Sequence, residues 1–162
     1  MNKFRAMRRR QVLSAALSLV TLLGVGSVAG APQAKPPAGR PIVKLDRLSL
    51  PDGLAQRAQL ETRLRATLKR EARRANWGAG RENHIEYRFS LQALEISQHG
   101  SVLRVRCAAL GELPGGEKAK SDVTFGGAPS ERTALVHRVV DVVARGVVSR
   151  LAELERTRRG LH

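Results

Sequence analysis

From His84 to Ala93 the sequence alternates strictly between apolar and polar residues, and this pattern restricts the possible folds more than any other feature. The apolar positions are Ile85, Tyr87, Phe89, Leu91 and Ala93. Because successive side chains of a strand point to opposite faces of a sheet, the segment predicts a strand with one buried and one hydrated face. We therefore expect Tyr87 and Phe89 in the core rather than on a surface that stacks nucleotide bases.

Two further strands are expected after this one. The alternation slips at 94–96, as a β-bulge would make it, and Gln98 to Ser101 predicts a turn into a strand from Val102 to Leu110. A polar loop from Gly111 to Lys120 then leads to a short strand near Ser121 to Phe125. The three strands predict an antiparallel meander.

Two segments with helical spacing flank the meander. Leu54 to about Asn76 follows a strand expected over Ile42 to Leu50, and it carries apolar residues three and four positions apart. The last helix is expected to begin with Ser130 as N-cap and to end near Arg156. Its valines would suit a strand, but its length and recurring polar positions favour a helix. Gly146 inside it indicates close packing against either the sheet or the first helix.

The order of these elements predicts the fold class. It is α+β: a β-α-β-β-β-α sandwich in which two helices cover one face of a mainly antiparallel four-stranded sheet. About 130 residues remain after the N-terminal segment, which is enough for one core. We expect a single domain over residues 42–158.

Residues 1–29 have the layout of a bacterial export signal. Arg8, Arg9 and Arg10 precede an uncharged apolar run, and small residues end it at Ser27 to Ala29. The stretch from Arg9 to Leu13 resembles the twin-arginine signal, and a general secretory signal is the alternative. An uncleaved anchor that permits membrane contact is a further alternative. Residues 30–41 predict a proline-rich linker. The expected location is therefore periplasmic or secreted, or the inner membrane with the domain facing the periplasm.

The helix after the first strand concentrates positive charge. Without residues 1–29 the chain holds 24 basic and 14 acidic residues, and this helix carries half of the excess of +10. Arginine offers a forked donor that fits two oxygens of a phosphate or carboxylate. The alternative is a solvated face, or a coding bias, because arginine greatly outnumbers lysine in the chain. The candidate residues for an anionic partner are Arg63, Arg65, Lys69, Arg70, Arg73 and Arg74.

Motifs for catalysis and cofactors are not found in the sequence. We expect no cofactor, no metal site and no catalytic residues, because His84, His99, His137 and His162 stand on separate elements without metal spacing. The single cysteine, Cys107, lies in an apolar strand pattern, which predicts a core residue and excludes an internal disulfide.

The order of elements from Ile42 to Arg156 is similar to that of small α/β sandwiches of Gram-negative envelope assembly. Examples are the lipopolysaccharide-assembly lipoprotein and the lipoprotein activators of wall synthases. The likeness covers the order of elements only, so it implies a fold and no functional residue. Both families attach lipid through a cysteine after the apolar run, and this chain has none there.

Export and charge together favour a non-enzymatic binding or assembly-accessory protein of the cell envelope. Its expected partner is an anionic glycolipid, a wall polymer or a protein subunit of an envelope assembly, and export disfavours nucleic acid. One alternative is an exported hydrolase in which His84, His99 or His137 meets a carboxylate or hydroxyl in the fold. Another is a structural subunit that buries its apolar helix stripe against a partner.

Overall fold

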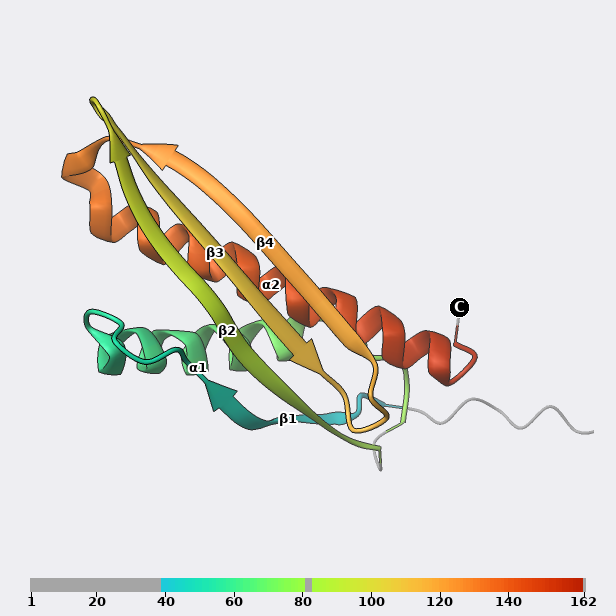
Figure 1. Cartoon of the computed structure of the whole chain (residues 1–162). Helices are drawn as coiled ribbons and strands as arrows, with labels where there is room; N and C mark the ends of the chain where they lie inside the picture. Colours follow the sequence, from blue (N-terminus) through green and yellow to red (C-terminus); the bar gives the residue numbers. More distant parts are fainter. Residues whose placement is uncertain (1–38, 81–82, 162) are drawn as a thin grey trace, which may run out of the picture. The chain divides into compact units, whose positions relative to one another are not determined.

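The computed structural model describes residues 39–80 and 83–161, and it confirms the predicted α+β class and element order. The elements are β1 (Ile42–Ser49), α1 (Arg57–Arg74), β2 (His84–His99), β3 (Val102–Glu112), β4 (Lys118–Gly127), a 3-10 turn η1 (Pro129–Glu131) and α2 (Arg132–Arg158) (Figure 1). The expected export signal and residues 30–38 of the expected linker lie outside the described residues. Among the helices of the described ranges, none has the length and apolar character needed to cross a membrane.

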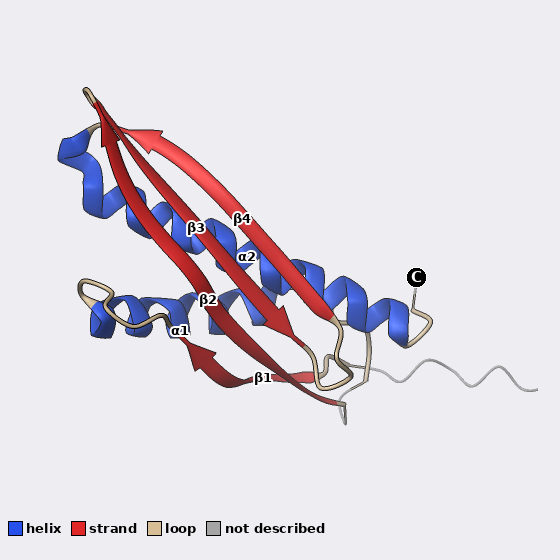
Figure 2. Ribbon diagram, viewed as in Figure 1, coloured by secondary structure: helices blue, strands red, loops and turns tan. Residues whose placement is uncertain are grey.

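The four strands form one sheet in the order β1-β2-β3-β4, with both helices on the same face (Figure 2). β1 runs parallel to β2, and the other neighbours are antiparallel. Parallel neighbours need a crossover connection, and α1 provides it. The crossover returns the end of α1 to the start of β1. The last turn of α1, with Arg73 and Arg74, therefore lies beside the start of β1.

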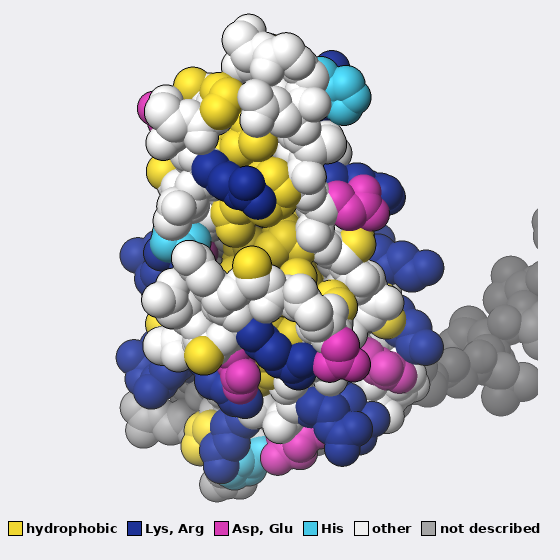
Figure 3. Space-filling model, turned by 60° about the vertical axis from the view of Figure 1, so that its left-hand side comes forward, with side chains coloured by type: hydrophobic (Ala, Val, Ile, Leu, Met, Phe, Trp, Pro, Cys, Tyr) yellow, Lys and Arg dark blue, Asp and Glu magenta, His cyan; other side chains and the backbone are white. Residues whose placement is uncertain are grey.

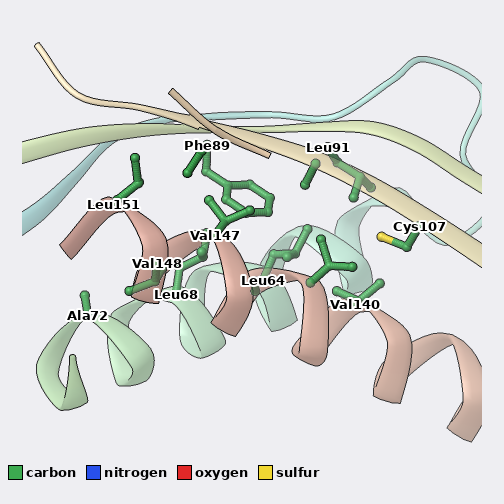
Figure 4. Close-up of a cluster of buried hydrophobic side chains, with 14 of the residues drawn as sticks. Leu64, Leu68, Ala72, Phe89, Leu91, Cys107, Val140, Val147, Val148 and Leu151 are labelled. Carbon is green, nitrogen blue, oxygen red and sulfur yellow. The ribbon is translucent and has the colours of Figure 1, made fainter. Parts of the chain in front are cut away.

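The core fills the space between the sheet and the helices. Four of the five residues of β2 predicted to face inward are buried, namely Ile85, Tyr87, Phe89 and Leu91, and so is Cys107 of β3. The prediction was wrong for Ala93, which is half-buried and pairs with Ala108 of the outer face, because the bulge before it reverses the alternation. Figure 4 shows Phe89, Leu91 and Cys107 pointing from the sheet toward side chains of α1 and α2. The core prediction for these residues is therefore confirmed.

α2 packs so closely on β3 that one strand position has no room for a side chain. A Cβ built on Gly111 would lie 2.5 Å from a methyl carbon of Val147 and 2.7 Å from Cδ1 of Leu151. Gly146 of α2 also lies against the sheet, since its Cβ would be 3.2 Å from Oγ of Ser121 on β4. Of the two packing partners expected for Gly146, the sheet and the first helix, it is the sheet that lies against it.

The bulge in β2 lies earlier than the sequence indicated. The register with β3 shifts between Leu91 and Ala93, so Gln92 is the extra residue. After the bulge, Leu94 and Ile96 pair with inward-facing Cys107 and Val105. The inner face of β2 therefore continues to the end of the strand.

Three predicted boundaries were wrong. Ser130 is not the N-cap of α2, because it lies within η1 and the cap position is Glu131, whose side chain makes no capping hydrogen bond. The expected loop from Gly111 to Lys120 is shorter, since Leu113 N–H donates to the carbonyl of Glu117 at 3.0 Å and closes a tight hairpin. The last strand is correspondingly longer. α1 begins at Arg57 rather than Leu54, because Gln56 adopts a left-handed conformation with φ of 56°.

The outer face of the sheet is hydrated and carries ion pairs between neighbouring strands. Arg106 of β3 donates two hydrogen bonds to Asp122 of β4, at 3.1 and 2.6 Å. These hydrogen bonds hold the pKa of Asp122 below its ordinary value. Arg88 of β2 similarly reaches Asp46 of β1 at 3.1 Å. The prediction of one buried and one wet face is confirmed.

Candidate anion-binding site

The six basic residues expected to bind an anionic partner divide between two faces of α1. Arg65, Lys69 and Arg73 follow one another at four-residue intervals, so they share one exposed face. Arg63, Arg70 and Arg74 contact carboxylates on the side of α1 that meets α2. The structure therefore separates the six into three on the outward face of α1 and three that contact carboxylates on the side of α1 facing α2.

Arg63 is committed to a contact between the helices. Its Nη2 lies 2.6 Å from Oδ2 of Asp141 on α2, and the hydroxyl of Thr67 donates to Oδ1 of the same carboxylate at 2.9 Å. Thr67 is buried and Asp141 is half-buried. The charge of Arg63 is thus balanced inside the fold.

Arg70 and Arg74 gather around a buried glutamate. Glu71 is 6% exposed, and it accepts a hydrogen bond from Nε of Arg70 at 3.0 Å. Arg74 lies 3.9 Å from the same oxygen, and Arg145 of α2 lies 3.6 Å from the other. The position of Glu71 seven residues after Leu64, on the buried face of the helix, is the feature of the sequence that indicates its burial.

The exposed face of α1 carries the cations that have the fewest contacts with carboxylates. Arg65 is paired with Glu61 one turn away, at 2.8 Å, in a contact typical of a hydrated helix surface. Lys69 and Arg73 have no carboxylate within ion-pair distance among the described residues. These two side chains are therefore the ones on α1 whose charge is free to act on a partner.

Arg73 and Arg74 also line a cavity at the end of α1. Its volume is about 460 Å³, and Arg40, which precedes β1, is a third arginine in its lining. The remaining lining residues are Pro41, Val43, Ala72, Ala75, Asn76, Trp77 and Gly78. The described lining thus contains three arginines and no carboxylate. Arg40 reaches this place because the crossover brings the end of α1 back to the start of β1.

The carbonyl end of a helix is negative, and its effect on an anion has to be considered at this cavity. Two carbonyl groups of the last turn already accept hydrogen bonds. The indole N–H of buried Trp77 donates to the carbonyl of Ala72 at 2.8 Å, and the N–H of Ala75 donates to that of Glu71 at 2.9 Å. These hydrogen bonds reduce the negative charge exposed at the end of the helix, and the three arginines of the lining add positive charge beside it.

The acidic residues of the domain contribute little to neutralising the positive charge of the arginines that line this cavity. Every carboxylate in the described ranges except Glu86 and Glu131 lies within 4.0 Å of a Lys or Arg nitrogen. The excess charge is consequently carried by cations that have no internal partner.

Residues considered for other chemistry lie apart. His84 and His99 are exposed, His137 is half-buried, and within residues 39–80 and 83–161 none of them forms an ion pair with a carboxylate. No group of three or more metal-ligating side chains occurs in those ranges. Cys107 is fully buried, and burial raises the pKa of its thiol to about 12.

The domain is thus a two-layer α+β sandwich with an arginine-lined cavity at the end of its crossover helix, α1. No protein-family model matches the chain, and no curated protein matches it. Among solved structures, it is similar to a minor lipoprotein from Acinetobacter baumannii, with 16% identity over 68% of this chain and 92% of that one and a TM-score of 0.40. It is also similar to the rare lipoprotein B from Shewanella oneidensis, with 16% identity over 70% of this chain and 99% of that one and a TM-score of 0.40.

Proposed function

We propose that the protein is a non-enzymatic, exported component of the bacterial cell envelope that binds an anionic partner through the cavity at the end of α1. In this proposal residues 1–29 direct export, residues 30–41 form a linker, and residues 42–158 act as one binding domain. The partner is a phosphate- or carboxylate-bearing glycolipid, a wall polymer or a protein subunit of an envelope assembly.

The observation that carries the proposal is the cavity itself. Arg40, Arg73 and Arg74 line it, and its described lining contains no carboxylate. Guanidinium groups at such a site can donate paired hydrogen bonds to phosphate or carboxylate oxygens. Lys69 lies on the same face of α1 as Arg73, four residues earlier, and adds to the local potential.

The six predicted residues differ in how strongly their contacts within the fold support a role in binding an anionic partner. Arg73 and Lys69 have the strongest case, because neither has a carboxylate within ion-pair distance among the described residues. Arg74 follows, since it lies 3.9 Å from Glu71 but lines the cavity, and Arg40, which the sequence pattern did not indicate, joins it there. Arg63 is the weakest candidate, because Asp141 already balances its charge. Arg65 and Arg70 are intermediate, since both have a carboxylate partner but remain exposed.

The test is binding of the protein to vesicles of phosphatidylcholine that contain either phosphatidylglycerol or lipopolysaccharide, compared with phosphatidylcholine alone. The double variant Arg73→Ala/Arg74→Ala is expected to weaken binding about tenfold or more, because each charge-assisted hydrogen bond is worth about 1.5–3 kcal/mol. About 0.5 M salt is expected to weaken wild-type binding strongly, since it screens exposed charges beyond a few ångströms.

A matched control removes the same amount of charge elsewhere. Arg104 of β3 and Arg138 of α2 are exposed, lie outside the cavity and have no carboxylate within ion-pair distance among the described residues. The double variant Arg104→Ala/Arg138→Ala is expected to bind nearly as well as the wild type. Equal losses in the two variants would reduce the effect to net charge and contradict a specific site.

Export is tested separately. Cell fractionation and determination of the mature N-terminus are expected to place the protein outside the cytoplasm. A full-length chain dissolved in the cytoplasm would contradict the envelope proposal, and nucleic acid would then become the better partner to examine.

A further inference from the structure

β2 has an edge that no strand covers along the second half of its length. β1 pairs with β2 only from His84 to Ser90, whereas β3 pairs with β2 as far as His99. From Leu91 to His99, therefore, β2 has β3 on one side and no strand on the other among the described residues. An uncovered edge presents backbone N–H and C=O groups that can pair with another chain.

This edge lacks most of the features that prevent strand pairing in natural sheets. Between Leu91 and His99 there is no lysine and no proline, and Glu95 is the one permanently charged residue. The bulge at Gln92 disturbs only the beginning of the stretch. The regular part, from Ala93 to Gln98, is as long as an average strand.

An apolar groove lies directly beside the free edge, where the helices leave the sheet uncovered. Its volume is about 480 Å³, and its apolar lining includes Leu54, Leu60, Leu94, Ile96 and Val136. Ile96 faces inward, yet it is 37% exposed because no helix covers it. Figure 3 looks toward this end of the domain and shows apolar side chains in a depression, with a basic side chain over them.

The described lining of the groove contains one positive charge and no negative charge. Arg132, at the start of α2, is the one permanently charged residue in its described lining, and His137 is the one other titratable group there. Arg132 has no carboxylate within ion-pair distance among the described residues. A carboxylate on the occupant would balance it. A second copy of this chain would instead bring its own Arg132 and its own excess of positive charge.

We propose that this edge and groove bind an extended peptide segment of a partner protein, which adds to the sheet as a fifth strand beside β2. Its backbone pairs with β2 between Ala93 and Gln98, and its alternate apolar side chains fill the groove over Leu94 and Ile96. An acidic residue of the segment lies near Arg132. A lipid chain could fill the groove, but it would leave the backbone groups of β2 unpaired. The free edge therefore favours a peptide.

The test uses the protein purified from cells and a fluorescent, end-blocked probe peptide with the sequence Asp-Thr-Val-Thr-Val-Thr-Val-Asp. The three valines lie on one face of the extended peptide and the threonines on the other. Wild-type protein is expected to bind it, and binding is expected to slow backbone hydrogen exchange in Leu91 to His99. Replacing the central threonine of the peptide by proline is expected to weaken binding about tenfold or more, because proline cannot donate to the strand ladder.

Variants of the protein separate the groove from the rest of the sheet. Ile96→Lys is expected to weaken binding about tenfold, because it places a charge over the apolar floor. Val102→Lys is the matched control, since Val102 is also exposed, at 44%, but belongs to the outer face and does not line the groove. Arg132→Glu is expected to weaken binding of the Asp-flanked peptide and to strengthen binding of a Lys-flanked version.

Several results would overturn the inference. They are no binding at millimolar peptide, equal losses for Ile96→Lys and Val102→Lys, and unchanged hydrogen exchange along the β2 edge. Displacement of the peptide by dodecyl phosphate without protection of the edge would assign the groove to an amphiphile instead. Salt-insensitive dimerisation that Ile96→Lys abolishes would assign the edge to a second copy. The variants change no residue of the arginine-lined cavity, so failure here leaves the proposed anionic site to be judged by its own test.

Discussion

Arg63 of α1 and Asp141 of α2 join the two helices through a contact of 2.6 Å between Nη2 and Oδ2. The hydroxyl of Thr67 donates a hydrogen bond to the other oxygen of the same carboxylate at 2.9 Å. The helices are thus connected by a polar contact above the apolar layer that both of them share. Arg63 therefore stabilises the packing of α1 against α2, whereas Arg73 lies on the exposed face of α1 and has no carboxylate within ion-pair distance among the described residues.

A double-mutant cycle with Arg63→Met and Asp141→Asn is expected to give a coupling energy of about 1 kcal/mol, because the pair is half-buried and hydrogen-bonded. Chemical denaturation of the two single variants and the double variant measures it. The exposed pair of Arg65 and Glu61 is the control, and its coupling is expected to be about 0.3–0.5 kcal/mol. Equal coupling in the two pairs would contradict a structural role for Arg63.

Gly111→Ala is expected to destabilise the domain by about 1–3 kcal/mol, because the new methyl group would overlap Val147 and Leu151 of α2. The free energy of unfolding from denaturant titration measures the loss. Gly126→Ala is the control on the neighbouring strand, since its Cβ would be 3.6 Å from the nearest atom, an ordinary contact. A neutral effect at Gly111 would show that α2 does not pack against β3 as closely as described.

Acid is expected to destabilise the domain partly through Glu155. This carboxylate is 3% exposed, and burial by itself would raise its pKa. Hydrogen bonds from Arg158 at 2.8 Å and Arg159 at 2.6 Å outweigh burial and hold the pKa below its ordinary value of 4.5. The stabilisation is therefore complete above the unfolded-state pKa, and it is lost as the pH falls through the lower, folded-state pKa.

Comparison of unfolding free energies at neutral pH and near pH 3, which is about one unit below the ordinary glutamate pKa, tests this sign. Glu155→Gln is expected to reduce stability at neutral pH and to flatten the loss on acidification. Glu153→Gln, at an exposed pair with Arg150 on the same helix, is expected to change neither clearly. An unchanged acid profile in Glu155→Gln would mean that other carboxylates cause the effect.

Cys107 is expected to react with thiol reagents only after unfolding. Its side chain is fully buried, and burial raises the pKa of the thiol to about 12, so very little reactive thiolate is present at neutral pH. Labelling with a disulfide reagent in the native protein and in urea measures the difference. Fast labelling of the native protein would show that β3 opens readily near Cys107.

The sequence pattern predicted the elements well and their contacts poorly. Period-two and helical spacing identified the sheet and both helices, because each pattern reports which side chains meet the core. Pattern alone does not report which strands are neighbours. The parallel pairing of β1 with β2, which brings Arg40 to Arg73 and Arg74, therefore had no signal in the spacing of residues.

The missed features have a common physical cause. Gly111 looked like the start of a loop, but the close approach of α2 requires it within a strand. Asp141, the partner of Arg63, and Arg145, one of the partners of Glu71, lie far away in sequence, on α2, so local charge patterns could not show these contacts. The available cations on α1 could be chosen only once the facing helix was known.

β1 is the edge strand that follows directly from the N-terminal part of the chain, and none of its side chains is fully buried. A force applied through the residues before Ile42 would act first on β1. Because β1 pairs with β2 alone and has no fully buried side chain, we expect it to separate from the sheet under tension before β2, β3, β4 and α2 lose their mutual packing.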